Sequence, residues 1–400
     1  MPTFVIAGAS LAGAKAAETL RDEGFDGQIV LLGSELERPY ERPPLSKGYL
    51  LGNDDLDSVY VHPVEWYAEH DVELRMGVTV TGIDRAASAV LTSDGSTFHY
   101  DKLLLTTGAS PRRLTFPGSD RDEVLYLRTT ADSERLRAAF QATPRVVVAG
   151  AGWIGLETTA AARSYGCPVT VLEPQPGALQ SQLGPELGSV FADLHRSHGV
   201  EFRFGESAAE FRPGLVITSA GAEVPADVLV VGIGAAPNDQ LAVAAGLEVE
   251  NGVLTDEALR TSDENIFAAG DVANWFSPLL GRQIRVEHWA NALNGGPAAA
   301  RSMLGQPVVY DPVPYFYSDQ YDLGMECAGL PSPGTYDEVA YRGDRASGEF
   351  IAFWLSRGIV VAGMNVNVWD VNDDIQSLIR SARPVDLTRL TNPEIPLPEV

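Results

Sequence analysis

Lysine is nearly absent from this 400-residue sequence, because only Lys15, Lys47 and Lys102 occur and arginine supplies the remaining basic side chains. Acidic residues are far more frequent, and the formal net charge is −25. Nucleic acids and anionic membranes are bound through basic surfaces, so this charge argues against both as partners. A lysine that stands inside a motif is therefore more notable here than usual.

Cysteine is also scarce, and its two positions, Cys167 and Cys327, are far apart in the sequence. They form neither a C-x-x-C redox pair nor a cluster with metal-ligand spacing. We therefore expect no metal site and no disulfide chemistry, and we interpret each cysteine as a small buried apolar residue.

Long apolar segments are missing as well, since no run is long enough to cross a bilayer. Residues Met1 to Ile6 lack the basic stretch with which a signal peptide begins. With a hydrophobic content of 45% and a charged content of 21%, these features predict a globular, cytoplasmic protein. A chain of 400 residues is expected to form two or three domains.

A glycine-rich motif in the middle of the chain carries the strongest signal. The β-branched run 146–149 leads into Gly150, Gly152 and Gly155, and after a helix-forming segment a second strand ends on Glu173. This acid lies about twenty residues beyond the glycines, the spacing of a dinucleotide site in which a pyrophosphate sits at a helix N-terminus. A carboxylate there accepts hydrogen bonds from a ribose 2′-hydroxyl and repels a 2′-phosphate, which favours NADH over NADPH.

The same pattern opens the chain. An apolar strand leads into Gly8 and Gly13, with Ser10 at the middle position where glycine is usual, and Glu35 stands at the ribose-acceptor position. Two such motifs imply two adenine dinucleotides, and the chemical reason for pairing them is that one passes electrons to the other.

Several other segments have clear local patterns. Asp132 is interpreted as the N-cap of a helix, residues 214–218 as a strand that extends the sheet of the second dinucleotide site, and residues 391–400 as an extended tail. Residues 350–355 and 359–365 flank a short turn and predict a hairpin.

Signature segments along nearly the whole chain allow a more specific interpretation. The narrowest are Arg-Pro-Pro-Leu-Ser-Lys at 42–47 and Glu-His-Trp-Ala-Asn-Ala at 287–292, and broader ones lie at 107–108, 127–129, 231–234 and 265–271. With the two glycine motifs, they resemble the FAD-dependent, NADH-dependent ferredoxin reductases of bacterial oxygenase and cytochrome P450 systems, the group of putidaredoxin reductase and the rubredoxin reductases.

This resemblance implies an α/β fold with two Rossmann-like dinucleotide-binding domains in the layout of glutathione reductase, plus a C-terminal α+β domain. The implied domains are an FAD-binding domain in two segments, an NADH-binding domain and a C-terminal reductase domain, at residues 1–110 with 236–308, 111–235 and 309–400.

The resemblance also implies the site residues. The implied catalytic residues are Lys47, which can stabilise negative charge on reduced flavin, and Glu157, which can orient Lys47 or the nicotinamide carboxamide. The implied FAD-binding residues are Gly8, Ser10, Ala12, Gly13, Glu35, Arg42, Lys47, Val80, Thr107, Gly108, Arg128, Asp271, Glu287, His288 and Trp289. The implied NAD-binding residues are Gly150, Gly152, Ile154, Gly155, Glu157, Glu173, Gly232 and Gly234.

The resulting functional prediction is an NADH-dependent ferredoxin reductase that passes electrons through FAD to a small iron–sulfur ferredoxin, and so indirectly serves a cytochrome P450 or another oxygenase. We expect a monomer or a weak homodimer, with a docking surface for the ferredoxin formed by Arg42, Arg282, Arg285, Arg301 and Arg345. Two alternatives stay open. One is an NADH oxidase or quinone reductase, and the other is an NADH-sensing flavoprotein similar to the apoptosis-inducing flavoproteins.

Overall fold

The computed structural model describes residues 1–400, which divide into two compact units, each assembled from separate segments of the chain. The first unit comprises Met1–Arg42, Leu56–Ser110 and Ala235–Pro312. The second unit comprises Pro43–Asp55, Pro111–Gly234 and Val313–Val400.

A five-stranded parallel sheet forms the centre of the first unit, in the order β19-β7-β1-β2-β3. Its strands are β1 (Thr3–Ala7), β2 (Gln28–Leu32), β3 (Val72–Arg75), β7 (Lys102–Leu105) and β19 (Ile266–Ala268). Strands β1 and β2 are almost wholly apolar, and residues such as Val5 and Val30 have no exposed surface. Continuous apolar runs of this kind are typical of parallel strands that are covered on both faces.

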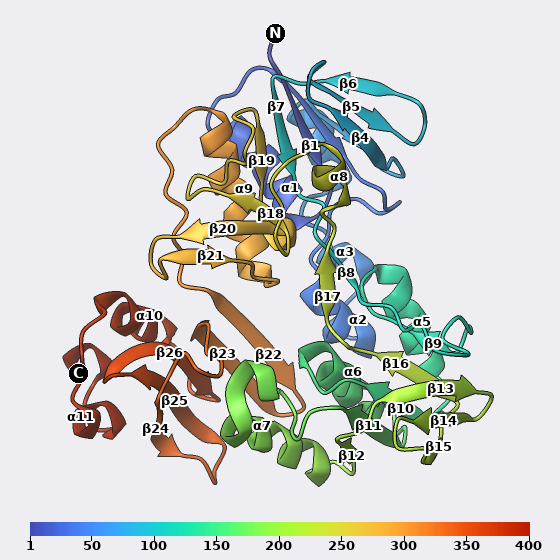
Figure 1. The fold of residues 1–400 in the computed structure, drawn as a ribbon, viewed down its shortest axis with the longest axis vertical. Helices are drawn as coiled ribbons and strands as arrows, with labels where there is room; N and C mark the ends of the chain where they lie inside the picture. The colour runs from blue at the N-terminus through green and yellow to red at the C-terminus, as the bar shows by residue number, and fades with distance from the viewer. The chain divides into compact units, whose positions relative to one another are not determined.

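Helices α1 (Leu11–Asp22) and α9 (Trp289–Met303) pack against each other although they are far apart in the sequence (Figure 1). Their backbones approach so closely at Gly296 that a Cβ atom there would lie 2.2 Å from the carbonyl oxygen of Ala12. The glycine on α9 therefore permits the position of α1, the helix that follows the first glycine motif.

The rest of the first unit consists of small sheets and short helices. A small antiparallel sheet consists of β4 (Val80–Asp84), β5 (Ala89–Thr92) and β6 (Thr97–His99). The other elements are α3 (Leu56–Val59), α4 (Val64–Glu69), β8 (Ala109–Pro111), β17 (Ala235–Pro237), α8 (Gln240–Ala244), β18 (Val253–Thr255), η2 (Gly270–Val272), β20 (Ala273–Ser277) and β21 (Arg282–Ile284).

A second five-stranded parallel sheet lies in the second unit, in the order β12-β11-β10-β16-β9. Its strands are β9 (Val124–Leu125), β10 (Val146–Ala149), β11 (Val169–Glu173), β12 (Glu201–Phe204) and β16 (Val228–Val231). Its helices are α5 (Thr130–Gln141), α6 (Trp153–Ser164) and α7 (Gln180–Ser197), and the segment 43–55 adds η1 (Pro43–Ser46) and α2 (Gly48–Leu51).

The C-terminal part of the second unit is an antiparallel sheet in the order β22-β23-β26-β25-β24, with two helices (Figure 1). The predicted hairpin is present and turns through Arg357 and Gly358, both with positive φ. The elements are β22 (Tyr315–Gln320), β23 (Leu323–Gly329), β24 (Glu338–Asp344), β25 (Glu349–Ser356), β26 (Ile359–Val366), α10 (Asn372–Ser381), α11 (Leu387–Thr391) and η3 (Leu397–Glu399). Two parallel sheets and this α+β part confirm the predicted fold class.

Three local predictions were wrong. The N-cap of α5 is Thr129, and Asp132 is the third helical residue, whose side chain completes a capping box by accepting from the Thr129 N–H. Strand β14 (Leu215–Thr218) does not extend the parallel sheet, because it pairs antiparallel with β13 (Ala208–Arg212) and β15 (Glu223–Pro225). The tail is not fully extended, since it ends in η3.

Both cysteines are free and buried, as the sequence indicates. Burial raises the pKa of the Cys327 thiol, so this side chain stays protonated and unreactive. None of the helices is both long and apolar enough to span a bilayer.

His195 on α7 should make the stability of the protein depend on pH. Burial lowers the pKa of His195 to about 4, well below the value of about 6.5 that an unfolded chain has. Between these values the unfolded state binds more protons, so stability is complete above pH 6.5 and falls as the pH drops towards 4, by up to about 3 kcal/mol. The urea midpoint should therefore fall over this range in the wild type and fall less in His195→Gln. His99→Gln, at an exposed position, is the control and should follow the wild-type curve. Parallel curves for all three proteins would contradict the assignment.

Candidate functional site

The glycine motif of the second unit leaves the N-terminus of α6 open. Gly150 has a φ of +100°, and a Cβ atom there would lie 2.4 Å from the carbonyl oxygen of Gly232. Gly155 is as constrained, because its Cβ would lie 2.1 Å from the carbonyl oxygen of Gly150. The N-cap Gly152 makes no side-chain capping bond, and the first turn of α6 contains no acid. The backbone N–H groups are therefore free to bind an anion, which the helix dipole also favours.

Glu173 is the last residue of β11, the strand next to β10. Its Oε2 accepts from the N–H of Ala151 over 2.8 Å, and its Oε1 accepts from the N–H of Gln175 over 2.9 Å. The carboxylate is therefore fixed directly beside the glycine motif, at the position that a ribose acceptor requires.

Apolar and glycine residues complete this end of the sheet. Gly232 follows β16 directly, and Gly234 has a φ of +91°. Ile154 and Ile233 are both exposed, at 44% and 39%. The structure thus brings the predicted NAD-binding residues to the carboxyl ends of neighbouring parallel strands, where α/β sheets bind their ligands.

Glu157 and Lys47 form a buried ion pair within the second unit. Lys47 follows η1, Glu157 lies on α6 beyond its first turn, and their Nζ and Oε2 atoms are 2.8 Å apart. The Glu157 carboxylate also accepts from the hydroxyl groups of Ser46 and, over 2.7 Å, Ser318. Only 4% of Glu157 is exposed. We call these four residues the Glu157 cluster.

A tyrosine ring and a second acid lie near the Glu157 cluster. The Nζ atom of Lys47 lies 5.4 Å from the centre of the Tyr317 ring. Loss of surrounding water raises the pKa of the Asp319 carboxyl group, and the nearby charges of Lys47 and Glu157 respectively lower and raise it. Removing one partner of a buried ion pair typically costs about 3–5 kcal/mol, so Lys47 and Glu157 constrain each other strongly.

The glycine motif of the first unit has the same geometry as the second. Gly8 has a φ of +130°, and its Cβ would lie 2.1 Å from the carbonyl oxygen of Thr106. A Cβ on Gly13 would lie 2.1 Å from the carbonyl oxygen of Gly8. Ser10 caps α1 without a side-chain hydrogen bond, and the first turn of α1 has no acid. The serine that departs from the glycine pattern therefore leaves this helix N-terminus as open as that of α6.

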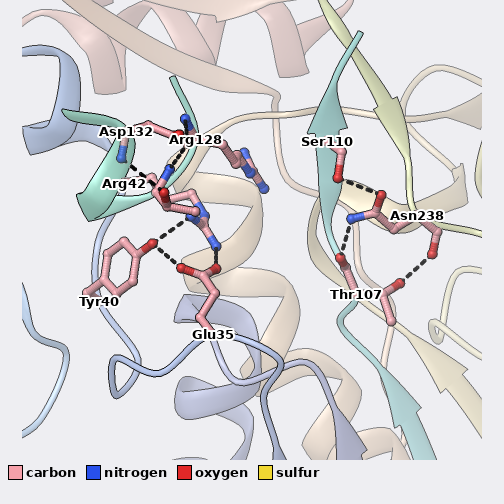
Figure 2. Close-up of polar contacts among 9 residues, drawn as sticks. Glu35, Tyr40, Arg42, Thr107, Ser110, Arg128, Asp132 and Asn238 are labelled. Carbon is pink, nitrogen blue, oxygen red and sulfur yellow. Dashed lines mark hydrogen bonds and ion pairs between the residues drawn. The ribbon is translucent and has the colours of Figure 1, made fainter. Parts of the chain in front are cut away.

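Glu35 lies in a compact polar group with Tyr40 and Arg42 (Figure 2). Its carboxylate accepts from the Tyr40 hydroxyl and, over 2.6 Å, from Nη2 of Arg42. Nη1 of Arg42 donates to the Tyr40 oxygen over 2.9 Å. Burial is the main reason why the pKa of Tyr40 is raised, so its phenol remains a donor. The proline-rich loop thus returns Arg42 to the end of β2, next to the predicted ribose acceptor.

Thr107 is held by Asn238 in a reciprocal pair of hydrogen bonds (Figure 2). The Thr107 hydroxyl donates to the Asn238 carbonyl over 2.7 Å, and the Asn238 amide donates to the Thr107 carbonyl over 2.8 Å. Ser110 adds a third bond, to Oδ1 of Asn238. The turn that contains Gly108, which has a φ of +68°, is therefore rigid.

The remaining predicted FAD-binding residues are spread over both units. Asp271 lies on η2, directly after the last strand of the parallel sheet, and its carbonyl oxygen accepts from Arg285. His288 is the N-cap of α9, which begins at Trp289. The backbone N–H of Arg128 donates to Asp132 (Figure 2). The remaining three are Ala12, buried on α1, Glu287, paired with Arg285, and Val80, in the apolar core of the first unit.

Three of the five arginines that the sequence analysis assigned to a docking surface are already paired with acids. Arg42 pairs with Glu35, Arg285 with Glu287, and Arg301 with Glu23. Their charges are therefore largely compensated within the first unit, which weakens the predicted basic surface.

Sequence reasoning missed the serines of the Glu157 cluster, together with Tyr40 and Asn238. Ser46 stands inside the quoted Arg-Pro-Pro-Leu-Ser-Lys segment, so that motif could have indicated it. Ser318 lies 161 positions from Glu157 and has no local signal.

Comparison with known protein families identifies the class. Residues 2–296 match the pyridine nucleotide-disulphide oxidoreductase family, and residues 315–400 match the reductase C-terminal family. The chain therefore belongs to the pyridine nucleotide-disulphide oxidoreductase family.

Individual relatives narrow this class to ferredoxin reductases and confirm the resemblance drawn from the sequence. The ferredoxin–NAD(+) reductase component of an anthranilate 1,2-dioxygenase system from Burkholderia cepacia is 40% identical over 399 residues, 98% of each chain. Putidaredoxin reductase from Pseudomonas putida is 36% identical over 99% of this chain and 96% of its own. Putidaredoxin reductase in its covalent complex with putidaredoxin superposes with a TM-score of 0.95, at 35% identity, over 100% of this chain and 97% of that one.

Proposed function

We infer that this protein is an NADH-dependent ferredoxin reductase, which passes electrons from NADH through bound FAD to a small iron–sulfur ferredoxin that serves a cytochrome P450 or another oxygenase. The observation that carries this inference is the repeated dinucleotide motif. Each unit has a parallel sheet whose glycine motif opens an uncapped helix N-terminus, and an acid follows the next strand. Relatives with this layout along the whole chain are named as ferredoxin reductases.

FAD fits the first unit by its chemistry. The Gly8 to Gly13 turn and the N-terminus of α1 would hold the pyrophosphate, Glu35 and Arg42 would bind the adenosine end, and Asp271 would accept from the ribityl chain. The turn at Thr107 and Gly108 and the start of α9 at Glu287, His288 and Trp289 would complete the site. FAD, when bound, takes up a hydride from NADH and releases it as single electrons.

NADH is assigned to the glycine motif of the second unit, with its pyrophosphate at Gly150 to Gly155 and its adenine ribose at Glu173. Accordingly, we propose the domain boundaries that follow from the resemblance: FAD binding by 1–110 with 236–308, NADH binding by 111–235, and a C-terminal reductase domain at 309–400. We also propose a cytoplasmic location, where NADH is available as a reductant. A monomer or weak homodimer remains part of this proposal.

Lys47 and Glu157 are proposed as the catalytic pair. The ammonium group of Lys47 would stabilise negative charge on the reduced flavin, because a fixed cation in a site with little water acts strongly on developing charge. Glu157 would hold that ammonium group in place and exclude other positions for it.

Glu173 should determine the choice between NADH and NADPH. Glu173→Ala removes the acceptor for the ribose 2′-hydroxyl and the negative charge that repels a 2′-phosphate, so the KM for NADH should rise about 10-fold. The preference for NADH over NADPH should fall by more than that. Steady-state kinetics with both nucleotides measure it, and Glu201→Ala, at an exposed acid on the neighbouring strand β12, is the control. An unchanged preference would contradict the assignment of Glu173.

The proposed function is tested by comparing electron acceptors. Turnover of NADH with purified ferredoxins of oxygenase systems should exceed turnover with oxygen or a small quinone by at least about 100-fold. Faster turnover with oxygen or quinone would identify an oxidase or quinone reductase instead. A persistent charge-transfer band with an NADH-dependent change in mass, and no rapid turnover, would identify an NADH-sensing protein.

A further inference from the structure

A row of buried polar side chains leads away from the Glu157 cluster into the second unit. Ser318 and Gln320 lie on the same face of β22, and both are 1% exposed. Nε2 of Gln320 is 3.1 Å from Oγ of Ser318, and Oε1 of Gln320 is 2.8 Å from Nε2 of His195. Nδ1 of His195 is 3.2 Å from the hydroxyl of Tyr321. This row joins α6, β22 and α7, and none of its atoms depends on the placement of the first unit.

The charge on Glu157 fixes the direction of every hydrogen bond in this row. An ionised carboxylate can only accept, so the hydroxyl of Ser318 must donate to Oε1 of Glu157. The oxygen of Ser318 then accepts from the amide Nε2 of Gln320, which leaves Oε1 of Gln320 to accept from His195. His195 must therefore carry its proton on Nε2, and its Nδ1 accepts from Tyr321. Every donor in the row points towards Glu157.

His195 is suited to this arrangement because it stays neutral. Its side chain is 0% exposed, and burial lowers its pKa to about 4 although the hydrogen bond to Gln320 acts in the opposite direction; the neighbouring His198 lowers it further. Only a neutral imidazole can donate from one nitrogen and accept at the other. A charged imidazole would have to donate from both, so the bond with Tyr321 would change direction and the tyrosine oxygen would become the acceptor.

The two oxygens of Glu157 have separate partners. Oε2 receives Lys47 and Ser46, whereas Oε1 receives Ser318 alone. Ser318 is thus the group that keeps the plane of the carboxylate from turning about its terminal torsion, which is intrinsically soft. If that plane turns, the ammonium group of Lys47 is no longer held at one point.

We propose that Ser318 and Gln320 are positioning residues that orient the Glu157 carboxylate towards Lys47 and thereby set the rate at which NADH reduces the flavin. This proposal rests on the function inferred above. It assigns to the C-terminal domain a part in the reductive half-reaction, through β22, in addition to any part in docking the ferredoxin.

Stopped-flow reduction by NADH tests the effect on the reaction. Ser318→Ala should lower the limiting rate of flavin reduction about 10-fold, because a small displacement of the Glu157 carboxylate also displaces the ammonium group of Lys47. The Kd of NADH should change less than about 3-fold. Ser318→Thr keeps the hydroxyl and should restore most of the rate. Gln320→Met should slow reduction in the same direction but less.

A matched control separates this role from simple loss of a buried hydrogen bond. Ser277 is 0% exposed, and its hydroxyl donates to Asp311 within the first unit. Ser277→Ala therefore deletes the same atoms from the same kind of bond and should leave the limiting rate unchanged. If Ser318→Ala reduces as fast as the wild type, or if Ser318→Thr reduces no faster than Ser318→Ala, the proposal is overturned. A wild type that NADH does not reduce would instead refute the proposed function itself.

A second measurement needs no flavin and no turnover. In protein labelled with ¹⁵N-histidine, the signal of His195, assigned by its absence in His195→Gln, should report a neutral ring protonated at Nε2 from pH 6 to 8. The same tautomer should be lost or mixed in Gln320→Met. A neutral ring with its proton on Nδ1 would reverse the direction of the row, and a charged ring at pH 7 would contradict the neutral imidazole on which the row is built. Either result would overturn the proposal, and neither depends on a variant that folds.

Discussion

Replacing Lys47 with methionine is expected to slow the reduction of bound FAD by NADH about 100-fold, the usual cost of removing one fixed group that stabilises developing charge. The Kd of NADH should change little, because the nucleotide is assigned to the glycine motif and Glu173. Oxidation of chemically reduced enzyme by ferredoxin should also be nearly unchanged. Anaerobic stopped-flow spectroscopy separates these steps.

Two controls make this result specific. Lys102→Met is the same substitution at one of the two other lysines, whose ammonium group donates to Asn265 over 2.7 Å on the first unit's sheet, and it should have no effect on the rate. Lys47→Met also leaves Glu157 as a buried unpaired charge, so it should lower stability. The double variant Lys47→Met with Glu157→Gln should regain stability but not rate. A fast single variant would remove Lys47 from the mechanism.

Gly150→Ala is expected to raise the KM for NADH about 100-fold. The added methyl group must displace the glycine turn, and a displacement of about 1 Å in a group that positions the substrate can cost about 100-fold. The added Cβ would lie 2.4 Å from the carbonyl oxygen of Gly232 at a φ of +100°, so the turn must move. FAD content should be unchanged, because the flavin is assigned to the other glycine motif. Flavin content, measured after denaturation, and steady-state kinetics check both expectations.

Gly166→Ala is the matched control for this substitution. Gly166 also has a positive φ, of +85°, but no atom lies within 4 Å of its Cβ position. It should therefore lose some stability and keep its KM. Equal effects on the KM in both variants would mean that backbone strain alone is responsible, and would contradict the assignment of the Gly150 motif.

The sequence alone was enough to predict those parts of the fold that depend on a short local pattern of residues. The runs 4–7 and 146–149 are apolar throughout, and each leads into glycines whose conformations only glycine adopts easily. Both parallel sheets and both helix N-termini followed from that pattern. The hairpin around Arg357 and Gly358 was equally local.

Features that depend on distant partners could not be predicted. Strand β14 has the composition of a sheet strand, but its neighbours β13 and β15 decide that it forms a separate antiparallel sheet. The local sequence around Glu157 shows only an acid near a helix N-terminus. Its ion pair with Lys47 and its hydrogen bond from Ser318 involve segments that are far away in the sequence. Asp132 was misassigned as the N-cap because both it and Thr129 are residues that can cap a helix, and only the geometry distinguishes them.

The central claim is that one chain binds both dinucleotides and moves electrons from NADH through FAD to a ferredoxin. Its most direct test is an anaerobic titration of the purified protein with NADH, followed by addition of an oxidised ferredoxin. The account predicts a yellow protein with one FAD per chain, bleached by a single equivalent of NADH and reoxidised by two equivalents of ferredoxin. A protein that stays colourless after saturation with FAD, or a yellow one that NADH does not bleach, would contradict it.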